Sequence, residues 1–479
     1  MKGLTDALHD LTATAQLAAL RAGELSSREL TAHYLDRIAD HDDELGAFTT
    51  VTAELAIEEA AQADKRIAEG EWSPLLGLPL GIKDLFATAG VRTTFGSAAL
   101  SDTVPDVNGW TTGLLRQAGA ILLGKTNTPE FGSTCYTENA VTAKPSVTPY
   151  DLTRYASGSS GGAAAAVAAG LLPVAHASDG AGSIRTPATT CHLVGMKPSL
   201  GLVTPNVPSG SFFPTTIEGP LARTVADAAL LLDVMAQPSS GDLHGWRPEQ
   251  LFTDVISQPP RPLRVAVWTE TGLDGVSPHP ETVRAVKRTA ALLEELGHDV
   301  QEVPLPSIWD EQLRDAMRRH FGYLVNLVVE SLVPMDRKGL LTPYTLFLDD
   351  IGAQLSGAEV LTTQAIMARS ASSYLAVFEQ ADVALTPVTS GPPVPLGHFD
   401  SAGVEAIIDL MLEWSVYTPW ANLTGQPAVA LPSHLDHDGL PYGVQLVGRP
   451  RHDLELLALA AQLESAALWD DVHPPCWSQ

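Results

Sequence analysis

The sequence predicts an α/β fold, a single large α/β/α sandwich in which a mixed, mostly parallel β-sheet is covered by helices. Short apolar runs bounded by Gly and Pro alternate with helix-like segments along most of the chain. These runs are apolar throughout, which is typical of strands buried on both faces. The 479 residues, 45% of them hydrophobic, suffice for a large core. Since no repeat or composition break forces a division, we interpret residues 1–479 as a single domain.

The N-terminal segment, residues 1–70, is predicted to be helical and to pack on the sheet. Ser26 and Glu29 form an S-x-x-E capping box, which marks the start of a helix. A second helix is expected over 53–70, ending at Gly70, because glycine commonly terminates helices.

The elements that follow are predicted from their apolar patterns. Strands are expected at 78–84, 120–127, 263–268, 298–303, 381–387 and 439–448. Helices are expected near 111–119, at 280–297, over most of 304–380 and at 453–466.

The charge balance limits the classes of partner. With 29 Lys and Arg against 56 Asp and Glu, the net charge is -27, which disfavours binding to nucleic acid or anionic lipid. No apolar run reaches the roughly 18 residues of a membrane helix, and the N-terminus lacks the apolar stretch of a signal peptide. We therefore expect a cytoplasmic protein with no nucleic-acid or membrane partner; the sequence leaves a homodimer open.

The three cysteines, Cys135, Cys191 and Cys476, are scattered and form no CxxC pair. This pattern supports neither a disulfide framework nor a zinc site. Buried, unreactive thiols are expected.

The segment 154–170, "RYASGSSGGAAAAVAAG", sets paired serines among glycines before an Ala-rich helix. A phosphate-binding loop would need a lysine, and none lies between Arg154 and Arg185. A G-x-S-x-G elbow with Ser160 as nucleophile fits the letters, but the preceding "YDLTRYAS" is a poor hydrophobic strand. The third interpretation depends on a second serine-containing turn.

That turn is "ASDGAGSIRTPA", residues 177–188, which follows an apolar run. Small residues allow several backbone N–H groups to point to one place, as an oxyanion hole requires. Ser183 in this turn is therefore a candidate nucleophile.

A nucleophilic serine needs a base. Lys83 ends an apolar strand, and burial there could lower its pKa from roughly 10.4 to near 7. The alternative is a lysine that reaches solvent or pairs with Asp84. His434 and His437 lie in a polar segment, where we expect a solvated loop and no catalytic role.

Seven motifs together resemble the amidase signature family, and they occur in the family's order over nearly the whole chain. They are "GIKD" (81–84), "GKTNTPEFG" (124–132), "SGSSGG" (157–162), "DGAGSIRTPA" (179–188), "GMKPSLG" (195–201), "ANLTGQPAVALP" (421–432) and "GLPYGVQLVGR" (439–449).

The resemblance implies a Ser-cisSer-Lys triad. Lys83 matches the base, Ser159 matches the bridging serine whose preceding peptide bond is cis, and Ser183 matches the nucleophile. The oxyanion would be held by the backbone N–H groups of residues Gly180, Ala181, Gly182 and Ser183. No metal or organic cofactor is implied.

Further positions carry smaller expectations. Supporting, scaffolding roles are expected for Asn127, Ser160, Asp179 and Arg185. Substrate contacts are expected from Ser133, Thr134, Cys135 and Ser157. The region of about 205–420 is expected to shape substrate specificity, with apolar walls from "SGSFFP" (209–214) and "WSVYTPW" (414–420).

Three residues depart from the family pattern, because Ser157, Ala181 and His192 stand where glycine is usual. Alanine rarely adopts a positive φ, so we expect the oxyanion turn to be slightly reshaped at Ala181. His192 could face the substrate, although a structural histidine is the stronger interpretation.

The resemblance implies an amidase that hydrolyses small amides, with aryl acylamides, oligoamides and carbamates as candidate classes, through an acyl-enzyme on Ser183. Three alternatives remain: the transamidation subunit of an aminoacyl-tRNA amidotransferase, which hydrolyses glutamine, an α/β-hydrolase esterase that uses Ser160, and a non-catalytic binding protein. The retained Lys83, Ser159 and Ser183 argue against the last.

Overall fold

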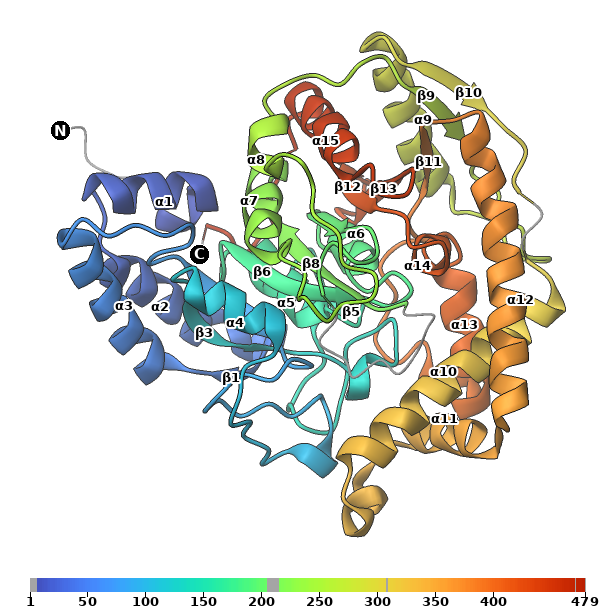
Figure 1. The fold of residues 1–479 in the computed structure, drawn as a ribbon, viewed down its shortest axis with the longest axis horizontal. Helices are drawn as coiled ribbons and strands as arrows, with labels where there is room; N and C mark the ends of the chain where they lie inside the picture. The colour runs from blue at the N-terminus through green and yellow to red at the C-terminus, as the bar shows by residue number, and fades with distance from the viewer. Residues whose placement is uncertain (1–6, 205–214, 307–308, 470, 479) are drawn as a thin grey trace.

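The computed structural model describes residues 7–204, 215–306, 309–469 and 471–478 (Figure 1). The predicted wall segment 209–214 lies outside the described residues. Among the residues that are described, no helix is both long enough and apolar enough to cross a membrane.

One large sheet of eleven strands runs through the molecule in the order β1-β3-β2-β6-β8-β7-β12-β13-β11-β9-β10. Its strands are β1 (Phe48–Val51), β2 (Pro79–Lys83), β3 (Ile121–Thr126), β6 (Val174–Asp179), β7 (Val194–Lys197), β8 (Ile217–Ala222), β9 (Arg264–Val267), β10 (Asp299–Glu302), β11 (Val383–Pro387), β12 (Ala428–Leu435) and β13 (Pro441–Gly448). A separate small sheet pairs β4 (Val147–Thr148) with β5 (Asp151–Tyr155).

The α/β fold and the mixed sheet are confirmed, but the expectation of mostly parallel pairing is wrong. Six of the ten neighbouring pairs among the described strands are antiparallel, and four are parallel. An apolar run shows that both faces of a strand are covered, and it carries no information about the direction of its neighbour. The short turn between β12 and β13 also makes that pair an antiparallel hairpin.

The helices cover the sheet and extend beyond one end of it (Figure 1). They are α1 (Ala13–Ala22), α2 (Ser27–Leu45), α3 (Ala53–Ala68), α4 (Trp110–Gln117), α5 (Gly161–Ala168), α6 (Arg185–Thr190), α7 (Val225–Met235), α8 (Phe252–Val255), α9 (Pro280–Glu295), α10 (Glu311–Leu332), α11 (Pro343–Gln354), α12 (Gly357–Leu375), α13 (Ile407–Trp414), α14 (Pro419–Leu423) and α15 (Asp453–Ala467). The expected helical stretch between 304 and 380 is present as α10, α11 and α12.

The N-terminal segment contains the predicted helices and one element that the sequence analysis missed. The capping box at Ser26 and Glu29 is present at the start of α2. Helix α3 ends just before Gly70, whose φ is +83°. Between α2 and α3, however, β1 adds an antiparallel edge strand to β3. The segment described from residue 7 onward is therefore not purely helical.

The Ala-rich helix α5 packs against β2, β6 and β8, and all eight of its residues are buried. Small side chains permit this close approach of helix to sheet. Since the paired serines immediately precede α5, the packing of this helix fixes them beside the ends of β2 and β6.

Candidate active site

The candidate catalytic residues converge from three segments. Lys83 is the last residue of β2, and Ser159 and Ser160 form the turn that leads into α5. Asp179 ends β6, and the turn after it carries Ser183 before α6 begins. Because β2 and β6 are parallel neighbours, their carboxyl ends lie at the same edge of the sheet.

Lys83 is fully buried and surrounded by hydroxyl groups. Its Nζ donates to Ser159 Oγ at 2.8 Å and to Ser160 Oγ at 2.8 Å. The same atom lies 3.1 Å from Ser178 Oγ and 3.3 Å from the Ser178 carbonyl oxygen. The alternative pairing of Lys83 with Asp84 is wrong, because Asp84 contacts Lys125 at 3.5 Å instead.

Burial lowers the pKa of Lys83 from 10.5 to about 7, since the negative charges of Asp179 and Glu218 only partly offset the loss of hydration. A substantial fraction of the amine is then neutral at neutral pH. A neutral lysine that contacts a serine hydroxyl can accept a proton from it.

The two adjacent serines have different surroundings. The peptide bond between Gly158 and Ser159 is cis, and Ser159 lines a cavity. Ser160 is fully buried, and its hydroxyl donates to the Ser178 carbonyl oxygen at 3.1 Å while it accepts from Lys83. The elbow interpretation with Ser160 as nucleophile is therefore wrong. The strand β5 that precedes this turn belongs to the small separate sheet, so it cannot present Ser160 from the main sheet.

Ser183 lines the same cavity as Ser159, and it is only partly buried. Of the four amides expected to bind an oxyanion, that of Gly182 donates to Asp179 Oδ1 at 2.7 Å. We therefore correct the expectation for Gly182, because its N–H is already used within the turn. In the described part of the chain, the amides of Gly180, Ala181 and Ser183 have no acceptor.

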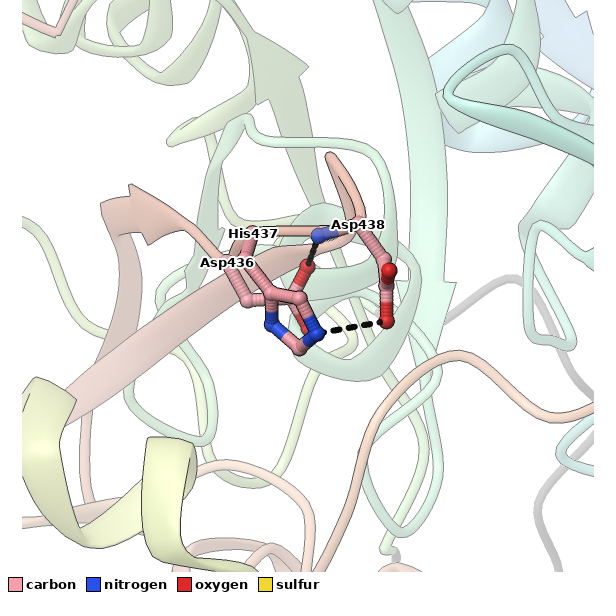
Figure 2. Close-up of side chains that lie close together, drawn as sticks. All are labelled: Asp436, His437 and Asp438. Atoms are coloured by element: carbon pink, nitrogen blue, oxygen red, sulfur yellow. Dashed lines mark hydrogen bonds and ion pairs between the residues drawn. The ribbon is translucent and has the colours of Figure 1, made fainter.

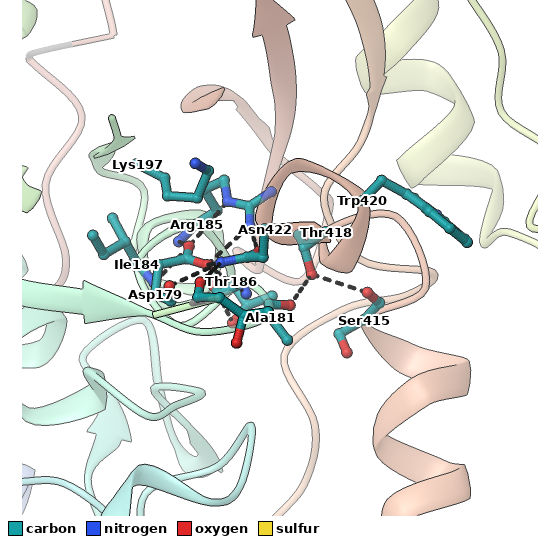
Figure 3. A network of polar contacts seen from close by, with 12 residues as sticks. Asp179, Ala181, Ile184, Arg185, Thr186, Lys197, Ser415, Thr418, Trp420 and Asn422 are labelled. Atoms are coloured by element: carbon teal, nitrogen blue, oxygen red, sulfur yellow. Dashed lines mark hydrogen bonds and ion pairs between the residues drawn. The ribbon is translucent and has the colours of Figure 1, made fainter. Parts of the chain in front are cut away.

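A buried polar network holds this turn, as Figure 3 shows. Asp179 forms an ion pair with Arg185 at 2.9 Å and accepts from the amides of Gly182 and Ile184. Asn422 Nδ2 donates to Asp179 Oδ1 at 2.9 Å, and Arg185 donates to Asn422 Oδ1 at 2.7 Å. Burial by itself favours the neutral acid, but Arg185 outweighs it and holds the pKa of Asp179 well below its ordinary value.

The other side of the turn is held from α14 and α6. Thr418 Oγ1 donates to the Ala181 carbonyl oxygen at 2.6 Å. Thr186 Oγ1 lies 3.1 Å from the Gly158 carbonyl oxygen and 3.0 Å from that of Gly182, so it joins the nucleophile turn to the cis-peptide turn. These contacts preorganise the turn without touching the reacting atoms.

Asp179→Asn is expected to destabilise the fold by about 3–5 kcal/mol, because it leaves the buried Arg185 guanidinium without a counter-charge. Urea unfolding monitored by circular dichroism measures the change. Asp151→Asn is the matched control, since the Asp151–Arg154 pair is partly exposed and such pairs contribute about 0–1 kcal/mol. Equal effects of the two substitutions would contradict the assigned bracing role.

The cavity above the candidate catalytic residues has a volume of about 400 Å³ and an apolar wall. Helix α10 supplies Phe321, Leu324, Val325, Val328 and Leu332. Helix α13 supplies Ile408, Met411 and Leu412. Of the residues that the structure describes, no Asp, Glu, Lys, Arg or His lines this cavity. The cavity therefore suits an uncharged, apolar group.

Three of the four expected substrate contacts line the cavity, namely Ser133, Thr134 and Cys135. The expectation for Ser157 is wrong, because this residue is buried behind the cavity wall and its hydroxyl donates to the Cys135 carbonyl oxygen at 2.9 Å. Burial raises the pKa of the Cys135 thiol, which keeps it protonated and unreactive. Burial likewise raises the thiol pKa of Cys191 and Cys476.

The departures from the glycine pattern have unequal structural effects. Ser157 and His192 both have left-handed backbones, with φ of 65° and 55°. Ala181 is absent from the described residues with positive φ, so alanine is not strained there. His192 lies outside the cavity lining, and burial lowers its pKa to about 3. These observations support the structural interpretation of His192.

Asn127 lies away from the cavity, where it braces two loops. Its Nδ2 donates to the Gly46 carbonyl oxygen at 3.0 Å, and its Oδ1 accepts from Asn139 Nδ2 at 2.6 Å. Both contacts agree with a scaffolding role.

The hairpin turn after β12 gathers Asp436, His437 and Asp438, whose potential ligand atoms lie within 4.8 Å of one another (Figure 2). Asp436 Oδ1 accepts from the amides of Asp438 and Leu440, both at 2.9 Å, so the hairpin turn accounts for the cluster. The expected loop position is correct for His437 but wrong for His434. His434 belongs to β12, is buried, and contacts Glu281 at 2.9 Å.

Several residues that build the site were not assigned a role from the sequence. Asn422 and Gln445 both contact Arg185, and they lie in recognised motifs. Ser178 was available as the neighbour of Asp179, whereas Thr418 gave no signal in the sequence.

Comparison with known proteins adds independent information. A family model described as Amidase matches residues 29–457. The chain is 32% identical over 477 residues to an acylamidase of Rhodococcus erythropolis, with 98% of each chain covered. It is 33% identical over 504 residues to the A-type subunit of a glutamyl-tRNA(Gln) amidotransferase of Desulforapulum autotrophicum, covering 95% of this chain and 97% of that relative. The solved structure of a bacterial aryl acylamidase, which belongs to the amidase signature enzymes, matches with a TM-score of 0.90 at 28% identity, covering 99% of this chain and 100% of that one.

Proposed function

Since the chain belongs to the amidase signature family and is an enzyme that hydrolyses the carbon–nitrogen bond of amides, we propose that it acts on small, uncharged amides through an acyl-enzyme on Ser183. The observation that carries this proposal is the hydrogen bond of the buried Lys83 amine to Ser159, beside a cavity that Ser159 and Ser183 share. The lowered pKa of Lys83 supports its role as the base.

In the proposed mechanism, Ser183 Oγ attacks the amide carbonyl carbon. Its proton passes to Ser159 Oγ, and the proton of Ser159 passes to the neutral amine of Lys83. The carbonyl oxygen becomes an oxyanion, which the free amides of Gly180, Ala181 and Ser183 are suited to bind.

Collapse of the tetrahedral intermediate breaks the carbon–nitrogen bond. Lys83 returns its proton through Ser159 to the leaving nitrogen, and the amine departs while the acyl group stays on Ser183. Water then attacks the acyl-enzyme by the reverse relay, which releases the carboxylic acid and restores the hydroxyl of Ser183.

The apolar cavity supports an uncharged substrate. Glutamine, the substrate expected of a transamidation subunit, carries an ammonium and a carboxylate, and burying both without counter-charges is unfavourable. The described cavity lining offers neither counter-charge. Aryl acylamides and other neutral amides fit this lining better, and they are the class that we propose.

The test measures hydrolysis by the purified chain of an apolar 4-nitroanilide, a neutral aliphatic amide and glutamine. We expect kcat/KM for the anilide to exceed that for glutamine by about 10²-fold or more, since buried unpaired charges are strongly rejected. Preferential hydrolysis of glutamine would overturn the proposal in favour of the transamidation subunit.

A further inference from the structure

The helical hairpin α10–α11 forms the apolar wall of the cavity and behaves as one unit. The helices cross at two glycines, where a Cβ on Gly352 would come within 2.3 Å of the Gly322 carbonyl oxygen. Such close backbone packing leaves little room for one helix to move against the other. The distance between the hairpin and the catalytic turns therefore depends on what anchors the hairpin.

Glu130 is a buried carboxylate that makes such an anchor. Its Oε2 accepts from the Thr342 amide at 2.8 Å and from Thr342 Oγ1 at 2.6 Å, at the residue that caps α11. Its Oε1 accepts from Ser97 Oγ at 2.6 Å. Within the described ranges, Glu130 forms no ion pair, so the hydrogen bonds to these three groups account for its burial.

Glu130 also begins the turn that faces the candidate relay serine. The turn Glu130–Gly132 is a short 3₁₀ helix, and Phe131 and Gly132 both line the cavity. A Cβ placed on Gly132 would lie 3.2 Å from Ser159 Oγ. One three-residue turn thus touches the catalytic layer and, through the Glu130 carboxylate, holds the cavity wall.

We propose that Glu130 is a positioning residue that fixes the α10–α11 hairpin against the catalytic turns and thereby sets the length of apolar group that the cavity accepts. This inference rests on the proposed function, because it concerns the substrate preference of the same site. Glu130 acts through Thr342, and no contact with the reacting atoms is required.

The other ionic anchors of the hairpin are more exposed. Arg337 pairs with Asp102, and the two side chains are 37% and 67% exposed. Arg318 pairs with Asp409 on α13, with exposures of 38% and 33%. Exposed ion pairs contribute little to stability, whereas a buried carboxylate with three donors is costly to remove. The Glu130 contact is therefore the anchor expected to control the wall.

The experiment compares Glu130→Ala, Glu130→Gln and Thr342→Val with the full-length wild-type protein on 4-nitroanilides of straight-chain acids from acetyl to decanoyl. Glutamine keeps the size of the side chain and can still accept from the Thr342 amide while it donates to Ser97. The matched control is Ser356→Ala, which removes the cap of α12 without touching Glu130. Thermal unfolding is recorded for every variant.

We expect Glu130→Ala to change the ratio of kcat/KM for decanoyl to that for acetyl anilide by roughly tenfold, mainly through KM, while kcat on the acetyl anilide stays within about threefold. Glu130→Gln should restore most of the wild-type ratio. Thr342→Val should shift the ratio in the same direction as Glu130→Ala, and it carries the test if that variant fails to fold. Ser356→Ala should leave the ratio unchanged.

An unchanged chain-length profile in Glu130→Ala or, where that variant does not fold, in Thr342→Val would overturn the inference. A shift of the same size in Ser356→Ala would also overturn it, because general loosening of the helices would then be the cause. Failure of the proposed function is a separate outcome, since the wild-type protein would then hydrolyse none of the anilides and Ser183 would not react with an acylating probe.

Discussion

Replacing Ser183 with alanine is expected to abolish covalent labelling by a fluorophosphonate and to lower kcat/KM for an apolar anilide by roughly 10⁴-fold or more. The loss is large because the substitution removes the attacking oxygen, and the remaining cavity and amides supply only binding and oxyanion stabilisation. Intact-mass spectrometry detects the label, peptide mapping locates it, and release of nitroaniline measures the rate.

Ser160→Ala is the matched control, because it removes an adjacent serine hydroxyl that contacts Lys83 but does not line the cavity. This variant should keep the label and lose about tenfold or less in kcat/KM, since one hydrogen bond to the lysine is lost. A label on Ser160, or undiminished labelling of Ser183→Ala, would contradict the assignment of the nucleophile.

Lys83→Met is expected to have opposite effects on activity and stability. Methionine fills a similar volume but removes the base, so kcat/KM should fall by roughly 10²–10⁴-fold. The buried amine has a pKa of about 7 in the folded chain and 10.5 as an ordinary lysine, so the folded state binds its proton less well than the unfolded state. The stability that the neutral amine permits is fully present above 10.5 and is lost as pH falls towards 7.

The substitution should therefore stabilise the protein near pH 7 by an amount on the order of 4 kcal/mol, less whatever the three contacting hydroxyls lose. The gain should shrink as the pH is raised towards 10.5. In the wild type, kcat/KM should rise with pH through about 7 and then level off, as neutral Lys83 becomes the dominant form. A variant that is less stable at every pH, or a wild-type rate that falls through this range, would contradict the role of Lys83.

Much of the fold follows from local sequence patterns, and its errors have identifiable causes. The capping box placed the start of α2 because the cap forms within four consecutive residues. Strand β1 was missed because it has only four residues, of which one is buried, and its pairing with β3 defines it. The direction of the strands was misjudged because strand pairing is decided by connections elsewhere in the chain.

The sequence by itself determined which residues carry the chemistry. Lys83 at the end of an apolar strand and Ser183 in a turn of small residues are local features, and the family motifs identified Ser159 as their link. These patterns are legible because a buried lysine and a glycine-rich turn need particular neighbours along the chain.

Only the tertiary structure decided how the turns are held and which groups remain free. It committed the Gly182 amide to Asp179, turned Ser157 away from the cavity, and placed Glu130 against Thr342, 212 positions later in the chain. It likewise placed Arg185 against Asn422, 237 positions later. Local periodicity cannot specify such contacts, because they arise when separately formed helices and strands pack and each buried polar group must find a partner.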